Sequence, residues 1–348
     1  MIHGDASFKE VTMRRSFGIG AALLLLVGCN SKPVDPPTAA PAVAQSSPSE
    51  KSAEAPAEKQ GALEATPPAE KAAQAPAKDS ETRRIENVGF ATPESVLFDP
   101  KSGGYFVSNI NGSPLEKDDN GFISVLHHTG KVHELKWIDG AAKDVVLNAP
   151  KGMGIAHGRL YVADIDVVRM FDIKSAEPLG EIPVKGATFL NDIAVGPDQT
   201  IYVSDSGLTT EFKASGTDAI YTINKANQVK VLIKDANLGR PNGLLVAGGV
   251  VLVATFGTGE MYGVAQNGER SKPVRVAKGQ LDGLVRVNER DVLVSSWGSK
   301  SVLMGKPGGV FEPIIEDLRA PADLGFDSDR KRVLVPLFQD NAVLIHQL

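Results

Sequence analysis

The sequence contains a single cysteine, few aromatic residues and no excess of positive charge. Cys29 has no partner in the chain, which excludes an intrachain disulfide. Aromatic residues make up 6% of the 348 residues whereas 35 residues are glycine, and this balance favours short strands and tight turns over long helices. The formal net charge of -5 argues against a general nucleic-acid binder, because phosphate affinity requires a concentrated cationic surface. Neither a G-x-S-x-G elbow nor a P-loop occurs, so serine hydrolase and nucleotide hydrolase functions lack support.

The cysteine lies at the end of a predicted export signal. Residues 13–29, MRRSFGIGAALLLLVGC, place two arginines before an apolar run that is too short for a stable transmembrane helix. The last four residues, LVGC, resemble the bacterial lipobox, whose cysteine carries the lipid after cleavage. We therefore predict a lipoprotein signal peptide over residues 1–29 with Cys29 as the lipidation site; an ordinary signal peptide with an incidental cysteine is the alternative. Asn30 rather than Asp follows the cysteine, so we expect the protein to face the periplasm from the outer membrane rather than the inner.

A tract of low complexity follows the signal. Residues 30–84 contain nine of the 22 prolines, many alanines, interspersed Glu and Lys, and no aromatic residue. Such a composition cannot bury enough apolar surface to fold, and proline keeps it extended. We predict a disordered linker that tethers the domain which begins at residue 85.

From residue 85 onward one pattern recurs six times. A polar phrase leads into an apolar run, a turn containing Gly or Asp follows, and a second strand of the LYVAD type ends the copy. The copies are TPESVLFDPKSGGYFVSN (92–109), APKGMGIAHGRLYVAD (149–164), FLNDIAVGPDQTIYVSD (189–205), RPNGLLVAGGVVLVAT (240–255), LDGLVRVNERDVLVSS (281–296) and APADLGFDSDRKRVLVP (320–336). Further strand hairpins lie between the copies, for example AIYTINKANQVKVLI (219–233).

Four strands per copy and roughly 40 to 45 residues per copy describe a propeller blade. We therefore predict an all-β, six-bladed β-propeller over residues 85–348. The last copy ends one strand short, and the segment RIENVGF (84–90) at the start of the domain has no blade of its own. This segment could supply the missing outer strand and so close the ring. An open sandwich of similar strands is the alternative, and it explains the sixfold recurrence poorly.

Polar residues recur at one position of the repeat. In a propeller the first strand of each blade lines the central channel, so residues that begin these strands meet near one mouth. Aligning each copy on the apolar residue two places further on gives Glu94, Lys151, Asn191, Asn242, Asp282 and Ala322. Side chains alternate along a strand, so Asp192 and Asp323, one place further on, are expected to face away from this set.

Two carboxylates and two carboxamides would then share a narrow, partly dehydrated space. Clustered carboxylates repel each other, and a bound cation relieves this repulsion. The donor atoms are hard oxygens, which suit Ca²⁺ best, while Mg²⁺, Mn²⁺ and Zn²⁺ stay open. The alternative is that each polar residue caps its own loop, because Asn and Asp often bond to nearby backbone.

Other polar residues are expected to serve the fold. Asp164 and Asp205 end second strands and are well placed to bond nearby backbone. His127, His128 and His133 lie in or near an outer hairpin, and no histidine has the spacing of a metal site.

The phrases PES (93–95), FLND (189–192), PNG (241–243) and LDG (281–283) together resemble the gluconolactonase, senescence-marker-protein (regucalcin) and luciferin-regenerating-enzyme family, over roughly residues 88–348. The resemblance implies a divalent cation held by Glu94, Asn242 and Asp282, with Asn191 touching substrate or a water on the cation. It further implies metal-dependent hydrolysis of a lactone or related ester. In that reaction Asp282 would act as the catalytic base toward water.

Two positions depart from this family. Sugar-lactone members carry an arginine where this chain has Phe189, and Lys151 stands where no cation is expected. Lys151 either replaces the arginine as a substrate-binding residue or pairs with Glu94 or Asp282 and weakens cation binding. With a divalent cation these three charges would leave the mouth positive, which favours an anionic or strongly polarised ligand. The alternative function is a non-catalytic propeller lipoprotein that binds a small ligand or an envelope protein partner.

Overall fold

The computed structural model describes residues 82–348. The predicted signal peptide, Cys29 and residues 30–81 of the predicted linker lie outside the described residues. The described part contains 24 strands and no helix, and thus no helix long and apolar enough to cross a membrane.

The strands form six four-stranded sheets, and paired strands are antiparallel throughout. Blade 1 contains β2 (Pro93–Phe98), β3 (Tyr105–Asn109), β4 (Phe122–Leu126) and β5 (Val132–Asp139). Blade 2 contains β6 (Pro150–Ala156), β7 (Arg159–Asp164), β8 (Val167–Asp172) and β9 (Pro178–Pro183). Blade 3 contains β10 (Leu190–Val195), β11 (Ile201–Asp205), β12 (Ala219–Ile223) and β13 (Val229–Lys234). Blade 4 contains β14 (Pro241–Ala247), β15 (Val250–Thr255), β16 (Glu260–Ala265) and β17 (Val274–Arg275). Blade 5 contains β18 (Leu281–Arg286), β19 (Val292–Ser296), β20 (Ser301–Gly305) and β21 (Phe311–Ile315). Blade 6 contains β22 (Gly325–Asp327), β23 (Arg332–Leu337), β24 (Ala342–Gln347) and β1 (Thr82–Ile85).

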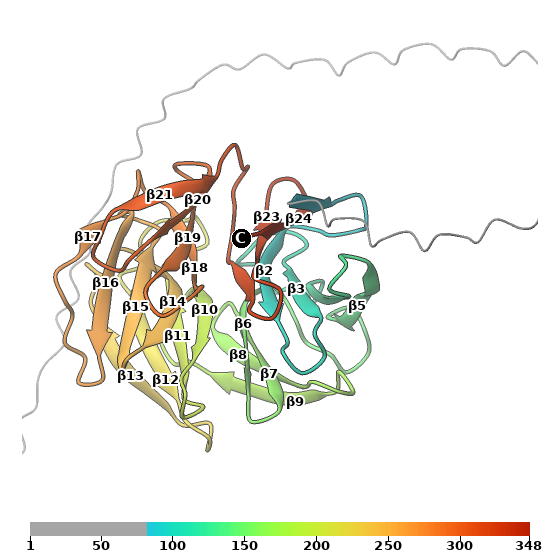
Figure 1. The fold of residues 1–348 in the computed structure, drawn as a ribbon. Helices are drawn as coiled ribbons and strands as arrows, with labels where there is room; N and C mark the ends of the chain where they lie inside the picture. The colour runs from blue at the N-terminus through green and yellow to red at the C-terminus, as the bar shows by residue number, and fades with distance from the viewer. Residues whose placement is uncertain (1–81) are drawn as a thin grey trace, which may run out of the picture. The chain divides into compact units, whose positions relative to one another are not determined.

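The first strands of the blades surround a common axis. Each of β2, β6, β10, β14, β18 and β22 contacts the first strand of the next blade, and β22 returns to β2 (Figure 1). A parallel bridge between Ser95 and Asp323 joins the two ends of this ring. The six-bladed β-propeller predicted from the repeats is therefore confirmed, and the sandwich alternative is wrong.

The ring closes through the beginning of the domain. Strand β1 pairs antiparallel with β24, from Thr82 opposite His346 to Ile85 opposite Val343. The prediction that the N-terminal segment completes the last blade is confirmed. The strand already includes Thr82, three residues before the expected start of the propeller. Closure leaves β24 with a partner on both sides, so it is not an open edge.

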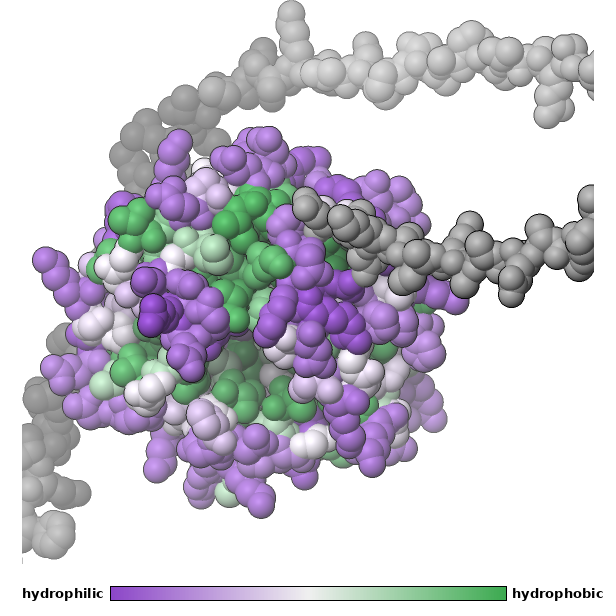
Figure 2. Space-filling model, in the orientation of Figure 1, coloured by the Kyte–Doolittle hydropathy of each residue, from purple (hydrophilic) through white to green (hydrophobic). Residues whose placement is uncertain are grey.

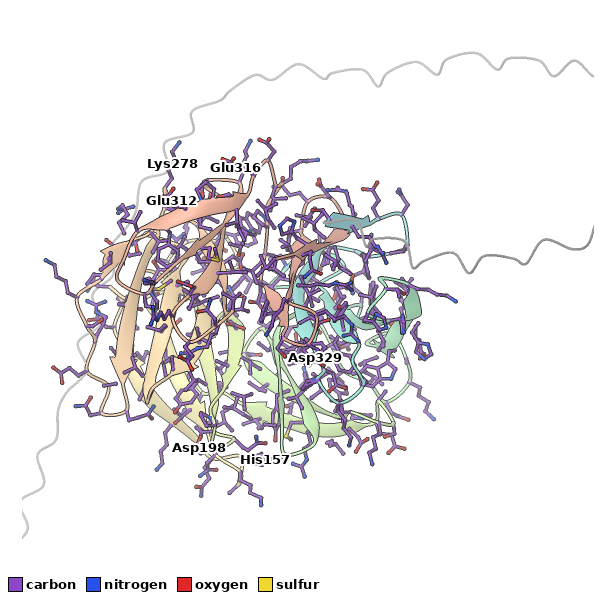
Figure 3. All side chains as sticks on the ribbon, viewed as in Figure 1. His157, Asp198, Lys278, Glu312, Glu316 and Asp329 are labelled. Carbon is purple, nitrogen blue, oxygen red and sulfur yellow. The ribbon has the colours of Figure 1, made fainter. Side chains whose placement is uncertain are left out.

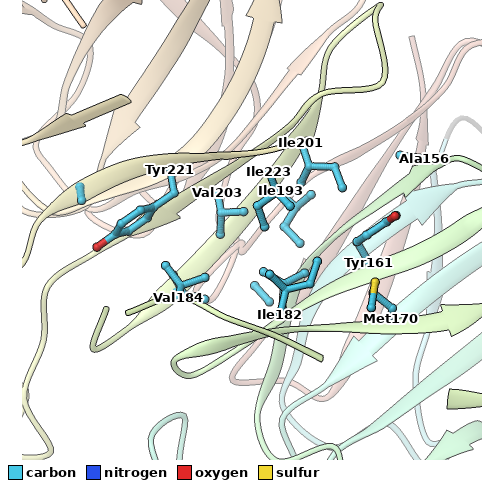
Figure 4. Close-up of a cluster of buried hydrophobic side chains, with 14 residues drawn as sticks. Ala156, Tyr161, Met170, Ile182, Val184, Ile193, Ile201, Val203, Tyr221 and Ile223 are labelled. Carbon is cyan, nitrogen blue, oxygen red and sulfur yellow. The ribbon is translucent and has the colours of Figure 1, made fainter. Parts of the chain in front are cut away.

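Apolar side chains hold neighbouring blades together. Between blades 2 and 3, Tyr161, Met170 and Ile182 pack in one buried cluster with Ile193 and Tyr221 (Figure 4). A comparable cluster fills each of the other five interfaces between blades. Because burial of one large apolar side chain contributes roughly 1.5–3 kcal/mol, these clusters fix the blades around the axis and so position the residues near it.

Charged residues lie toward the outside of the ring. Figure 2 shows one face, on which apolar residues gather near a central hollow and hydrophilic residues cover the periphery. The labelled charged side chains Asp198, Lys278 and Glu312 lie on the exposed surface of the molecule (Figure 3). The polar residues at the axis are therefore set apart from the solvated surface.

Candidate functional site

The structure brings five of the aligned polar residues to one cavity. Glu94, Lys151, Asn191, Asn242 and Asp282 come from the beginnings of β2, β6, β10, β14 and β18, and all five line a cavity of about 320 Å³. Each is at least 94% buried. Residues up to 188 positions apart in the sequence thus form one polar floor, as the strand register predicts.

β-Bulges turn these side chains toward the cavity. In blades 1 to 5 the pairing of the first strand with the second is interrupted at the aligned residue. In blade 3, for example, Asn191 and Asp192 together lie opposite the single residue Ser204. A bulge bends the strand and re-aims its side chains. The repeat therefore encodes a local distortion as well as a strand.

Serines of the second strands satisfy the backbone freed by three of these bulges. The hydroxyl oxygens of Ser108, Ser204 and Ser295 accept hydrogen bonds from the backbone N–H of the residue after the aligned one, at 2.9, 2.9 and 2.8 Å. Ser204 in turn donates to the Asn242 carbonyl at 2.8 Å. The serine thus ties one blade to the floor residue of the next.

Glycines allow the first strands to approach each other at the hub. A Cβ atom on Gly243 would lie 2.2 Å from the Asp282 carbonyl oxygen, and one on Gly283 would lie 2.1 Å from the Leu324 nitrogen. Both distances are far below van der Waals contact and involve backbone atoms. Only glycine fits at these positions, and the close approach keeps Asn242 and Asp282 on neighbouring strands together.

Four buried oxygens of the floor have no hydrogen-bond donor among the described residues. They are Glu94 Oε2, Asn191 Oδ1, Asn242 Oδ1 and Asp282 Oδ1. The Asn191 amide is oriented, because its nitrogen donates to Ser206 Oγ at 3.1 Å and its oxygen is left over. An unpaired buried acceptor costs on the order of 1–3 kcal/mol, so four in one cavity indicate a ligand that supplies positive charge or donors.

Burial disfavours the charged forms of both carboxyl groups. Burial raises the pKa of Asp282 to about 8, with a smaller contribution from the charge of Asp192, while Trp297 and Asn242 oppose the rise. Burial also raises the pKa of Glu94 well above its usual value, and the charge of Asp282 adds to this shift. A cation in the cavity would reverse both shifts, since it favours the ionised carboxylates.

Lys151 places a cationic side chain in the floor of the cavity. It is 99% buried, its Nζ donates to the Ala149 carbonyl at 3.0 Å, and Nζ lies 4.7 Å from the centre of the Phe189 ring. Burial lowers the pKa of Lys151 to about 8, and the charge of Glu94 opposes the shift. Among the ion pairs of residues 82–348, none joins Lys151 to Glu94 or Asp282. Lys151 thus faces the cavity without neutralising either carboxylate directly.

The residues one place further along the strands lie on the other side of the floor, as expected. Asp192 and Asp323 line a separate cavity. Asp192 accepts hydrogen bonds from the backbone N–H groups of Ile193 and Leu244, both at 2.6 Å, and Asp323 accepts one from Ser95 Oγ at 2.5 Å. These two carboxylates accept hydrogen bonds from the protein, whereas four of the aligned residues each keep one oxygen without a donor.

Asp164 and Asp205 bond nearby backbone groups, as the sequence predicts. Asp164 accepts from the backbone N–H groups of Asn148 and Ala149, at 3.2 and 2.9 Å. Asp205 accepts from the backbone of Phe189 at 2.9 Å and of Gly207 at 3.0 Å. His157 lies in the turn between β6 and β7, away from the hub (Figure 3). No group of three or more His, Cys, Asp or Glu residues within the described range could hold a metal ion, so a cation site here depends on the two amides as well.

Sequence reasoning missed the walls of the cavity. Phe256, Trp297 and Phe338 rise from the floor and form a continuous aromatic contact. Each follows directly after a second strand, within the phrases ATFG, SSWG and PLFQ. The signal in the sequence is an aromatic residue directly after the second strand of blades 4, 5 and 6.

Comparison with known proteins identifies the fold of this chain but not its reaction. No protein-family model and no curated protein matches the sequence. Among solved structures, a gluconolactonase from Xanthomonas campestris is similar with a TM-score of 0.58 and 17% identity, covering 77% of this chain and 90% of that one. A luciferin-regenerating enzyme is similar with a TM-score of 0.57 and 13% identity, covering 77% and 97%.

A third similar structure carries a different activity in its name. A streptogramin B lyase matches with a TM-score of 0.55 and 10% identity, covering 76% of this chain and 97% of that one. At such identities the likeness shows a shared propeller fold. Because one fold supports several chemistries, the function of this chain must be argued from its own site.

Proposed function

We propose that the chain is a divalent-metal-dependent hydrolase of a lactone or related ester. The observation that carries the proposal is the set of four buried oxygens without donors, two of them from carboxyl groups, at the floor of one cavity. The similar folds of a gluconolactonase and a luciferin-regenerating enzyme are consistent with it.

The donor set fits a hard cation. Glu94, Asn242 and Asp282 would hold it, and Asn191 would bind substrate or complete the set. All offered atoms are carboxylate or amide oxygens, which Ca²⁺ prefers, and Mg²⁺, Mn²⁺ and Zn²⁺ can use the same oxygens. When bound, such a cation supplies positive charge that polarises an ester carbonyl and stabilises the negative charge that develops on its oxygen.

The side chains of the floor can perform the remaining steps. Asp282 takes a proton from the attacking water, whose oxygen bonds to the carbonyl carbon. The bond from that carbon to the ring oxygen then breaks, and Asp282 returns the proton to the leaving oxygen, so that a lactone gives a hydroxy acid. Lys151 lies in the same cavity with one hydrogen bond to protein, and its remaining N–H groups can bind the carboxylate formed.

We propose that this domain works in the cell envelope. The support is the sequence pattern that ends in Cys29 and the Ala- and Pro-rich tract that follows it. The lipid would hold the protein at a bacterial membrane, and the tract would let the propeller reach substrate away from the surface.

Elemental analysis and activity measurements test the hydrolase proposal together. We expect the purified protein to contain about one divalent ion and to hydrolyse members of a lactone panel when Ca²⁺, Mg²⁺, Mn²⁺ or Zn²⁺ is present. Chelation should lower thermal stability, because an ion at a hundred times its dissociation constant adds about 2.7 kcal/mol. A protein without metal, turnover or response to chelation would instead be the non-catalytic binding lipoprotein.

A further inference from the structure

The walls of the cavity are built by one position of the repeat. The residue directly after the second strand is Ile110 in blade 1, Phe256 in blade 4, Trp297 in blade 5 and Phe338 in blade 6, and all four line the cavity. Their backbone N–H groups donate to carbonyls of the segments that lead into the first strands, for Trp297 to Gln280 at 3.0 Å. These hydrogen bonds therefore anchor the walls to the segments that lead into the floor strands.

Three of these residues form one aromatic surface. The rings of Phe256 and Trp297 meet edge to face with centroids 5.5 Å apart, and those of Trp297 and Phe338 are 5.2 Å apart. Phe189 adds a further ring to the lining of the cavity, beside Lys151. Phe256, Trp297 and Phe338 all remain partly exposed, so part of their apolar area faces the cavity and is not covered by other side chains.

The walls of the cavity carry few polar groups. Ser206 is occupied, since its hydroxyl donates to the Pro241 carbonyl at 2.7 Å and accepts from Asn191. The methylenes of Arg240 lie against Gly257, so part of this side chain also presents hydrocarbon. Trp297 Nε1 is buried without a well-formed hydrogen bond among the described residues, but it lies near enough to Asp282 to oppose the rise in the pKa of that carboxyl group. Apart from the Trp297 indole and the Arg240 guanidinium, the walls offer few partners for the several hydroxyl groups of a sugar.

We propose that the cavity binds a carbonyl compound with an apolar body, such as an alkyl- or aryl-substituted lactone or ester, and selects it over a sugar lactone. The carbonyl lies on the polar floor and the body lies against Phe256, Trp297 and Phe338. A floor with few polar groups below apolar walls is the arrangement that orients such a ligand. The hydrolysis of this ligand rests on the proposed function, but its binding does not.

Trp297 provides a readout of binding that needs no turnover. The chain has two tryptophans, and Trp137 packs on Phe106 with ring centroids 5.0 Å apart, outside the cavity. In a Trp137→Phe variant, Trp297 is the only tryptophan. We would titrate this variant, with and without Ca²⁺, with a δ-lactam that carries a pentyl side chain and with glucono-δ-lactam.

The proposal expects a saturable change of Trp297 fluorescence with the pentyl lactam and a response at least about tenfold weaker in affinity with the sugar lactam, as loss of apolar burial predicts. No response to the pentyl lactam, or an equal or stronger response to the sugar lactam, would overturn it. Phe256→Ala and Phe338→Ala in the same background should weaken the pentyl lactam and leave the sugar lactam unchanged; equal weakening of both would also overturn the assignment of these walls.

Kinetics on δ-lactones with lengthening alkyl chains separate this inference from the proposed function. We expect kcat/KM to rise about three- to fourfold per methylene until the chain fills the cavity. A flat series, or a preference for glucono-δ-lactone, contradicts the apolar specificity while leaving hydrolysis intact. Binding of the pentyl lactam without turnover of any lactone contradicts hydrolysis while leaving the apolar specificity intact.

Discussion

Adjacent residues at the hub have opposite environments. Asn191 turns an unpaired oxygen into the cavity, whereas Asp192 beside it accepts two backbone hydrogen bonds. The same contrast separates Asp282, which has an unpaired oxygen, from Asp323, which is bonded to Ser95. Asp282 and Asp323 are the same type of residue, so only their positions in the strand register distinguish the one that faces the cavity from the one that does not.

A pair of isosteric substitutions tests this contrast. Asp282→Asn should lower affinity for a divalent ion by about a hundredfold or more, because it removes one of two carboxylates from the donor set. Asp323→Asn, on the other side of the floor, should change affinity only slightly. Calorimetric titration of the two variants with Ca²⁺ measures both, and a comparable loss in each would show that the two carboxylates share one site.

The pKa shift of Asp282 predicts how the chelated protein responds to pH. Its folded-state pKa of about 8 lies above the usual value of 3.8, so its contribution to stability is full below about pH 4 and is lost as pH rises toward 8. Glu94 shifts in the same direction. Lys151, with a pKa of about 8, stays charged over most of this range.

We therefore expect urea unfolding of the chelated protein to show falling stability from about pH 5 to pH 8, by an amount on the order of a few kcal/mol. Saturating Ca²⁺ should oppose the fall, and Asp282→Asn should flatten the curve of the chelated protein. A chelated wild type that gains stability over this range would contradict the raised pKa.

At the scale of the strands, the bulge and its serine form a repeated unit. Ser108, Ser204 and Ser295 occupy blades 1, 3 and 5, while Ala163 and Ala254 occupy the corresponding positions of blades 2 and 4. Where the serine is present, its hydroxyl fills the gap in the ladder. The two strands of these blades are thus joined at the floor through a side chain.

Removal of one such hydroxyl should loosen the floor. Ser204→Ala leaves the Asp192 N–H without its acceptor and should cost about 1–3 kcal/mol of unfolding free energy. The exposed Ser328→Ala serves as the control and should stay within about 0.5 kcal/mol of wild type. Chemical denaturation measures both, and an unchanged midpoint for Ser204→Ala would mean that water replaces the hydroxyl.

The sequence predicted the features that recur at the same position in each repeat. The six apolar runs gave the blades, and alignment of Glu94, Asn191, Asn242 and Asp282 gave the floor of the cavity. The bulges could not be predicted, because they depend on pairing between strands and their residues still look like continuous strand. The wall was missed for another reason: Trp297 and its neighbours lie just beyond the strand, where the repeat looks like a loop.

At the scale of the whole molecule, closure of the ring determines where the floor residues meet. Glu94 lies on the first strand of blade 1 and Asp282 on that of blade 5, with blade 6 between them on the short path around the ring. Blade 6 contributes no charged residue to the cavity and positions the two carboxylates through its packing on β2 and β18. The site therefore depends on an element that supplies it with no ligand.

The outer strand of that blade offers a direct test. Strand β1 covers the edge of β24 and carries Ile85 into the cluster between blades 6 and 1, while Arg84 pairs with Asp340 at 2.9 Å. A chain that begins at Thr82 should fold with the stability of the longer protein, whereas one that begins at Glu86 should expose β24, lose several kcal/mol of stability and associate through that edge. Thermal unfolding and light scattering distinguish the two chains.

Because blade 6 sets the distance between Glu94 and Asp282, the shorter chain should also lose calcium affinity, although every proposed ligand is still present. Unchanged affinity would show that the floor is held by blades 1 to 5 alone.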